Sequence, residues 1–307
     1  MSRIPSRHPR AAAPHAPAAS KPAHAPAPIE KEVEARPTNW SRATGKPVGR
    51  SSTNTLTFRG GAVLSKPVIN NIYFGDYWLT ANGKGESKQN DAFSTDLFKS
   101  KHMSVLAQYG VGQGSFAGST TLPGRPTNIA AADVERIVKA QIAAGTESKD
   151  PQTIHTVILP PGCVLTSPSG ADSKQGLGGF HGSYADASGK PVYYAVIAYS
   201  DTQGNGINFD GKSIDAVNIT ESHEWMEAAT DPDVNSPIAG RKLAWYNDAG
   251  GEIGDLAIRK LPLAQTFETV DGFKVQKEWS NLDGKFETIE SDPNSPVVPP
   301  IGAKVFG

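Results

Sequence analysis

Histidine and acidic residues in the segment 213–255 have the types and the spacing of a metal site. The sequence HEWME occupies positions 223–227, so that His223 and Glu227 stand four residues apart. Residues at this spacing share one face of a helix. In the H-E-x-x-H zinc helix, two such side chains bind one ion and the glutamate acts as general base. Because a glutamate oxygen also binds zinc, we expect His223 and Glu227 to bind Zn²⁺ and Glu224 to take a proton from water.

More carboxylates follow this motif along the chain. They are Asp231, Asp233, Asp248, Glu252 and Asp255. Carboxylates that lie close together repel one another unless a cation or a basic side chain lies among them. Arg241 and Lys242 are the basic residues nearby, and they can pair with some of these acids. We expect either Asp255 or Glu252 to complete the metal site, with Asp255 preferred.

Two interpretations without zinc catalysis stay open for the same residues. In the first, His223 hydrogen-bonds Glu227 inside a packed core and no metal binds. In the second, the acidic cluster binds Ca²⁺, which takes six or more oxygen ligands, in a non-catalytic binding or structural protein. Its partner could be a polysaccharide, because aromatic side chains can stack on sugars, although such residues more often belong to the core. The candidates are Tyr77, Trp78, Trp245 and Tyr246.

Further candidates for chemistry lie outside the motif. His181 belongs to the sequence GGFHGS at 178–183, whose glycines predict a flexible loop before a strand and permit close backbone approach. We expect His181 or Tyr246 to stabilise an oxyanion, with an exposed loop histidine as the alternative. Cys163 is the single cysteine, which excludes an intramolecular disulfide. Its surroundings, PPGCVL, indicate a structural residue at a strand end. The sequence contains no P-loop, dinucleotide fingerprint or G-x-S-x-G motif.

A helix must present the His-Glu pair to the interior. Ser213 is a good N-cap and Pro232 a good stop, so the sequence predicts a helix over Ile214–Thr230. Apart from His223 and Glu227, the residues on their face are apolar or small. That face therefore points into the protein, where a charged group needs a partner or a metal.

The remaining elements predict an α/β or α+β fold, a mixed sheet with packed helices. Strands are expected at Thr55–Phe58, Pro67–Phe74, Thr153–Leu159, Pro191–Tyr199 and Phe273–Trp279, and helices at Asp91–Gln108 and Ala130–Ala144. After Asp255 we expect only short strands and turns.

Composition separates the first part of the chain from the rest. Residues 1–52 are rich in Ala and Pro and have few large apolar side chains, which predicts a disordered tail. Residues 53–307 are expected to form a single domain. The net charge of −1 gives no indication of nucleic-acid binding or a membrane surface. No apolar run reaches the roughly 18 residues of a membrane span.

The motifs resemble those of the EXORDIUM, or phosphate-induced protein 1, family and its bacterial relatives. The resemblance covers about Val68 to Asn281. The matching segments are Ile72–Gly75, Tyr109–Val111, Gly179–Gly182, Tyr194–Val196, Ser222–Glu224, Glu227-Ala228, Thr230–Pro232, Ala244–Tyr246 and Gly251–Leu256. The segments around His223 and Asp255 are the most specific of these.

The resemblance implies a protein of a secreted, wall-associated group that has no settled enzymatic activity. The His-Glu helix of that family is similar to the helix of zincin metallopeptidases, an analogy rather than evidence of proteolysis. This chain departs from the family at Ala257, where relatives commonly have a cysteine, and it lacks a second cysteine near the C-terminus. An extracellular location is therefore left open. Together, the residues predict a zincin-like, metal-dependent peptidase or amidase acting on a peptide.

Overall fold

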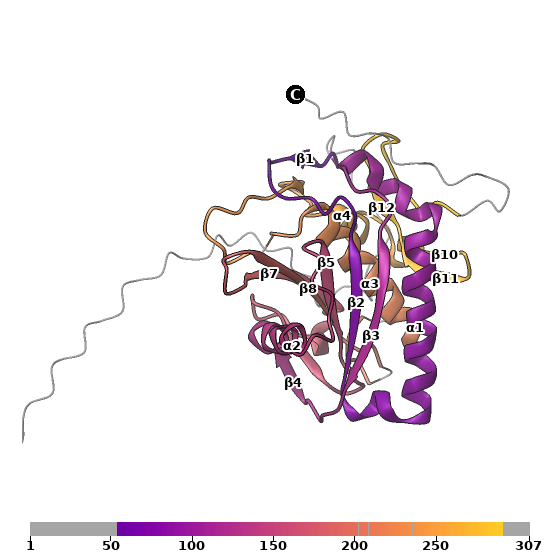
Figure 1. The fold of residues 1–307 in the computed structure, drawn as a ribbon. Coiled ribbons are helices and arrows are strands. Elements are labelled where there is room, and N and C mark those ends of the chain that lie inside the picture. The colour runs from indigo at the N-terminus through magenta and orange to yellow at the C-terminus, as the bar shows by residue number, and fades with distance from the viewer. Residues whose placement is uncertain (1–53, 202, 208, 235, 291–307) are drawn as a thin grey trace, which may run out of the picture. The chain divides into compact units, whose positions relative to one another are not determined.

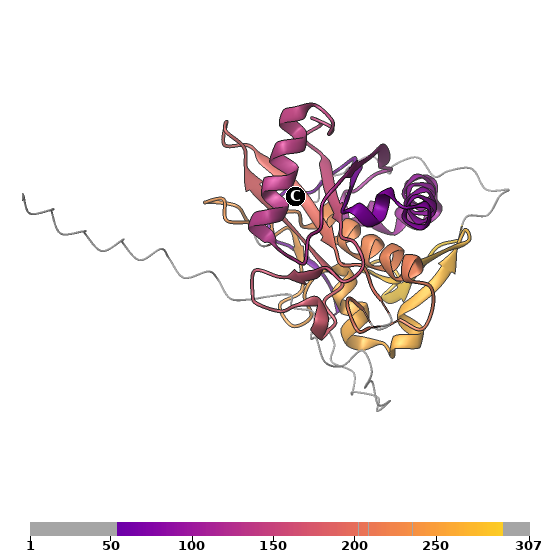
Figure 2. The same cartoon turned by 90° about the horizontal axis from the view of Figure 1, so that it is seen from below.

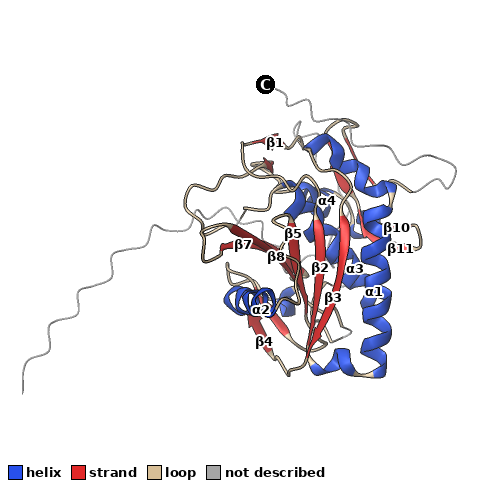
Figure 3. Cartoon of the chain, in the orientation of Figure 1, coloured by secondary structure: helices blue, strands red, loops and turns tan. Residues whose placement is uncertain are grey.

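A five-stranded mixed sheet forms the centre of the fold in the computed structural model (Figures 1 and 3). Its strands lie in the order β3-β2-β5-β8-β7. The parallel strands are β2 (Val68–Phe74), β3 (Ser115–Leu122), β5 (Thr153–Ile158) and β8 (Pro191–Ile197). The edge strand β7 (Gly179–Ala185) is antiparallel to β8. The structure describes residues 54–290 except 202, 208 and 235, so the predicted tail over residues 1–52 lies outside the described residues.

Helices cover both faces of this sheet, as Figures 1 and 2 show. Successive side chains of a strand point to opposite faces. On one face, α1 (Ala81–Lys99) and α3 (Ser213–Thr230) pack over strand residues that include Ile69, Ile154 and Ala195. On the other, α2 (Ala131–Ala144) packs over a set that includes Ile72, Val157 and Val196. The predicted mixed sheet with packed helices is confirmed.

Several elements differ from the sequence prediction. The helix expected over Asp91–Gln108 consists of α1, which starts ten residues earlier at Ala81, and a 3₁₀ segment, Lys101–Tyr109. The early turns of α1 have almost no buried apolar residue to mark them, whereas the Thr80 hydroxyl caps them by accepting from Gly83 N–H. Strand β3 was not predicted, because its small polar residues alternate only between exposed and half-buried positions.

The chain after α3 contains a further helix where turns were expected. This helix, α4 (Ile253–Lys260), is followed by α5 (Leu263–Thr266) and two hairpins. The hairpins are β10 (Phe267–Val270) with β11 (Phe273–Gln276), and β12 (Glu278–Ser280) with β13 (Lys285–Glu287). The predicted strand Phe273–Trp279 is therefore two strands, broken at Lys277.

Short elements complete the described part of the chain. β1 (Thr57–Phe58) pairs with β9 (Trp245–Tyr246), and β4 (Asn128–Ala130) pairs with β6 (Val164–Thr166). Two 3₁₀ turns span Asp76–Leu79 and Ser173–Gln175. Cys163 is fully buried, and burial raises the pKa of its thiol to about 12, as suits a structural residue. Among the helices of residues 54–290, none combines the length and the hydrophobicity needed to cross a bilayer.

Candidate metal centre

Helix α3 positions the centre, and the sheet fixes its rotation. The helix begins at Ser213, one residue before the predicted start, and ends at Thr230 as predicted. On the side that faces the sheet, the Trp225 indole N–H donates to Thr156 Oγ1 over 2.8 Å, and its ring stacks on Phe93. Nearly every residue of α3 is buried. The His-Glu pair therefore looks into a protein interior, as the sequence predicted.

His223, Glu227 and Asp255 come together at one point. A ligand atom of each lies within 4.8 Å of the others. His223 Nε2 is 3.3 Å from Glu227 Oε2, so the predicted one-turn spacing brings both side chains to the same place. The His223 side chain is 12% exposed to solvent, and that of Glu227 is 2% exposed. One nitrogen and two carboxylate groups form a set of ligands that suits zinc.

The start of helix α4 delivers Asp255 to this point. The segment 251–255, expected as an acidic turn, contains the first residues of that helix. Asp255 N–H donates to Glu227 Oε1 over 2.9 Å, and Glu252 N–H donates to Asp255 Oδ2 over 3.3 Å. The unpaired N–H groups and the positive end of a helix favour carboxylates there. The acids of this segment are thus placed by a helix terminus.

His181 approaches from the edge strand β7 and not from a loop, which corrects the sequence prediction. Its Nδ1 lies 3.2 Å from Glu224 Oε2, and its Nε2 lies 3.2 Å from the Asp231 carbonyl oxygen and 3.5 Å from Glu252 Oε1. The side chain is buried, so the alternative of an exposed loop histidine is wrong. The neighbouring glycine has a steric reason: a Cβ on Gly179 would lie 3.2 Å from Glu224 Cγ. Glycine there allows α3 to approach the strand.

The structure separates the predicted acids into two groups. Asp255 belongs to the centre as a member of the first triad, with His223 and Glu227, and Glu252 borders it at 3.5 Å from His181 Nε2. His181, Glu224 and Glu227 form a second triad, whose ligand atoms lie within 4.8 Å of one another. Asp233 and Asp248 do not belong to it, because they pair with Arg241 at 3.1 Å and Arg59 at 2.7 Å. Arg241 is thus engaged with one of the acids, as the sequence allowed.

Burial and mutual repulsion raise the pKa of the acids in the centre. Burial raises the pKa of Asp255 to about 6, and raises that of Asp231 to about 8 with a further contribution from Glu252. Burial and then Asp255 hold the pKa of Glu227 well above its usual range. Burial lowers the pKa of His181, but the carboxylates of Glu252 and Glu224 prevail and raise it well above its usual value. The centre therefore favours bound cations or protons.

Sequence reasoning missed residues that surround the centre. Gln276 on β11 donates to the Gly254 carbonyl over 2.8 Å, and its amide nitrogen lies 3.0 Å from His223 Nδ1. Glu278 on β12 is fully buried and both its oxygens lack a hydrogen-bond partner, and its charge raises the pKa of Glu227. In the sequence, Glu278 stands between Lys277 and Trp279 in a stretch of alternating polar and apolar residues. That pattern predicts an exposed side chain, so it gave no indication that Glu278 is buried.

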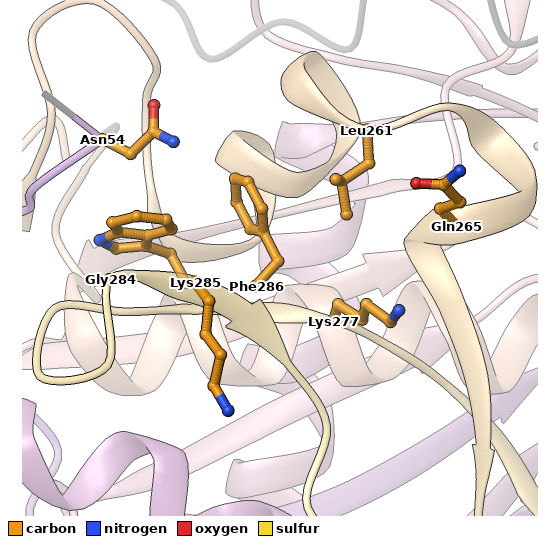
Figure 4. Close-up of a pocket in the computed structure, with 8 residues that line it drawn as sticks. Asn54, Leu261, Gln265, Lys277, Gly284, Lys285 and Phe286 are labelled. Atoms are coloured by element: carbon orange, nitrogen blue, oxygen red, sulfur yellow. The ribbon is translucent and has the colours of Figure 1, made fainter. Parts of the chain in front are cut away.

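A pocket in the described part of the chain lies elsewhere. It has a volume of about 500 Å³ and is shown in Figure 4. Its lining residues are Asn54, Leu261, Gln265, Lys277, Trp279, Gly284, Lys285 and Phe286. None of the residues of the two ligand triads belongs to that lining. Among His223, Glu227 and Asp255, the His223 side chain is the most exposed to solvent.

No family model, no curated protein and no solved structure matches the chain.

Proposed function

We propose that the chain is a metal-dependent hydrolase, of the peptidase or amidase type, whose ion is held by His223, Glu227 and Asp255. The observation that carries the proposal is the approach of these three ligands to within 4.8 Å of one another. Catalytic zinc sites take three protein ligands and keep one position open. A zinc ion bound there would supply Lewis acidity, which polarises a carbonyl group and lowers the pKa of water. Glu252, the other predicted ligand, belongs to neither triad, so Asp255 is the better third ligand.

Glu224 is the residue to which we assign proton transfer. Its Oε1 lies 3.9 Å from His223 Nε2, so the carboxylate borders the ligands of the first triad. The contact of its Oε2 with His181 Nδ1 at 3.2 Å orients the group. A carboxylate held in this position can take a proton from the attacking water and give it to the leaving amine.

Tyr246 is the preferred donor to negative charge that develops on the substrate. Its side chain is buried, and burial followed by the charges of Glu252 and Asp255 raises its pKa, so the hydroxyl stays protonated at neutral pH. His181 already contacts Glu224 and the Asp231 carbonyl through its two ring nitrogens. That engagement favours Tyr246 for the oxyanion and His181 for orienting the base.

Metal analysis and peptide hydrolysis together test this function. The purified protein should contain or take up one zinc that His223→Ala loses, and it should cleave members of a fluorogenic peptide library. Glu224→Gln should keep that zinc and lose about 10²- to 10⁴-fold in rate. His155→Gln is a matched control, because His155 is also buried and lies 3.0 Å from a buried glutamate, Glu147. Equal zinc uptake by the parent chain and His223→Ala would end the proposal.

The second candidate is a non-catalytic protein in which the same acids bind Ca²⁺ as a structural ion. The burial of the ligands favours it, since Glu227, Glu252 and Asp255 are 2%, 1% and 4% exposed. Calcium binds carboxylate and carbonyl oxygens in sites of six to eight ligands. A thermal stability that falls with EGTA and is insensitive to a zinc-selective chelator would favour this candidate.

Membership of the EXORDIUM family and the nature of the substrate are parts of the same proposal. The segments that carry the resemblance, Ser222–Glu224, Ala244–Tyr246 and Gly251–Leu256, contribute residues to the centre. A peptide is the substrate that the hydrolytic chemistry favours. A polysaccharide finds less support, because Trp78 and Tyr246 are only 1% and 5% exposed. The other two candidates, Tyr77 and Trp245, are half-buried and each packs against two further aromatic rings.

A further inference from the structure

Two overlapping triads of ligand atoms exist in the centre, and the proposed function uses one. The first consists of His223, Glu227 and Asp255, and the second of His181, Glu224 and Glu227. Glu227 belongs to both. All residues of the second triad are at most 4% exposed, and they come from the edge strand β7 and helix α3.

The hydrogen bonding of His181 requires a positive charge between its Nδ1 and Glu224. A backbone carbonyl only accepts, so the contact of His181 Nε2 with the Asp231 oxygen at 3.2 Å requires the proton on Nε2. A ring with one proton then presents the lone pair of Nδ1 to Glu224 Oε2, 3.2 Å away. Two lone pairs that face each other need a positive charge between them: in the metal-free protein the raised pKa of His181 supplies a second proton on Nδ1, and a bound cation would take the place of that proton. Histidine ligands of metals commonly donate their other N–H to a carbonyl or a carboxylate, as His181 does here.

A further buried carboxylate lies beside the other ring nitrogen of His181, Nε2. Glu252 is 1% exposed, its Oε1 has no hydrogen-bond partner, and this atom lies 3.5 Å from His181 Nε2. Within residues 54–290, no lysine or arginine forms an ion pair with Glu224, Glu227 or Glu252. A buried carboxylate without such a partner is costly.

We infer that His181, Glu224 and Glu227 form a second divalent-cation site, which shares Glu227 with the first and takes Glu224 as a ligand. The inference rests on the proposed function for its consequence: the second ion removes Glu224 from proton transfer, so excess metal inhibits the hydrolase. The ligand set, one imidazole and two carboxylates, suits zinc or another borderline transition ion.

Zinc uptake by the full chain tests the second site without relying on activity. Metal-free protein is equilibrated with Zn²⁺ at graded free concentrations, and bound metal is counted. His181→Gln, which keeps an N–H donor toward Asp231, should bind one equivalent fewer than the parent chain. His155→Gln, the matched buried pair with Glu147, should bind as many as the parent. The number of bound zinc ions is compared between each variant and the parent chain. Any zinc held by His8, His15 and His24, which lie outside the described residues, is common to all of them and cancels.

Activity supplies a second measurement. The rate should rise with the first equivalent and fall at least tenfold with the second, and a chelator buffered to remove only the weaker ion should restore it. Equal uptake by His181→Gln and the parent chain would overturn the second site and leave a proton between His181 and Glu224. Loss of one equivalent in a chain that never hydrolyses a peptide would instead support the site and refute the hydrolase.

Discussion

The side-chain carboxylate of Glu227 accepts a hydrogen bond from the backbone N–H of Asp255, and the two atoms lie 2.9 Å apart. One metal ligand of the first triad is therefore held by the backbone of another, 28 residues later in the chain. The bond joins the last turn of α3 to the first turn of α4 and satisfies an N–H that α4 itself leaves unpaired. The geometry of the site thus depends on how two helices meet.

Substitutions of Glu227 separate its structural and metal-binding roles. Glu227→Gln keeps an oxygen for the Asp255 N–H but loses the charge, so zinc uptake should disappear while the metal-free protein stays at least as stable at pH 8. Glu227→Ala leaves the buried Asp255 N–H without an acceptor. It should therefore lower the free energy of unfolding by about 1–3 kcal/mol more than Glu227→Gln does. Zinc titration and urea denaturation measure the two effects. Equal stability of both variants would show that the helix–helix bond contributes little.

Gly254 is the residue whose enlargement should displace His223. A Cβ at this position would collide with His223 Nδ1 and lie 2.9 Å from the Gln276 amide nitrogen. Gly254→Ala should therefore weaken zinc binding at least 100-fold while lowering the free energy of unfolding by only about 1–3 kcal/mol. Gly85→Ala in α1 is the control, because a Cβ there would meet no atom within 4 Å beyond the local helix backbone. That variant should keep the metal and gain about 0.5–1 kcal/mol. Unchanged zinc affinity in Gly254→Ala would contradict the assigned position of His223.

The stability of the metal-free protein should fall as the pH rises. Burial raises the pKa of Asp255 from 3.8 to about 6 and that of Asp231 from 3.8 to about 8. For an acid whose pKa is higher in the folded state, the stabilisation is complete below the unfolded pKa and is lost as the pH passes the folded pKa. We therefore expect the free energy of unfolding to fall by several kcal/mol between pH 4 and pH 8, because each unit of pKa shift corresponds to about 1.4 kcal/mol.

Zinc should reverse this dependence, because its ligands must lose their protons. Added zinc should raise the melting temperature more at pH 8 than at pH 5, and Asp255→Asn should flatten the pH dependence of the metal-free protein. Thermal unfolding with and without EDTA across this range measures both. A metal-free protein that is equally stable at pH 5 and pH 8 would mean that these acids are not buried together.

The sequence predicted those parts of the site that depend on local spacing. A helix with His223 and Glu227 one turn apart places both side chains on one inward face, whatever the rest of the fold. The predicted Ser213 cap was wrong, because Ser213 is the first helical residue and Lys212 precedes it without a side-chain cap. The acids of 251–255 could be anticipated because repulsion between buried carboxylates demands a cation. The choice of Asp255 over Glu252 could only be a preference, because it depends on where α4 begins.

Contacts between residues far apart in the chain could not be predicted from the sequence. Glycines at 178, 179 and 182 suggested a loop around His181, whereas the structure uses them for close packing: a Cβ on Gly179 would lie 2.7 Å from the Val196 carbonyl oxygen. The same residue type serves flexible turns and tight strand–helix contacts, and only the neighbour distinguishes them. Gln276 and Glu278 reach the centre through hairpin and sheet packing that no local pattern encodes.

Gln276 should control which nitrogen of His223 is available to a metal. Its amide N–H groups face the Gly254 carbonyl at 2.8 Å and His223 Nδ1 at 3.0 Å, so Nδ1 accepts and a neutral imidazole carries its proton on Nε2, toward Glu227. Zinc at Nε2 requires that proton to move to Nδ1, where a carboxylate would accept it. Gln276→Glu should therefore bind zinc about tenfold more tightly at pH 8, and Gln276→Met, which offers no strong acceptor, should not. Competition with a zinc-binding dye gives both affinities, and weaker binding by Gln276→Glu would place the metal on the other side of the ring.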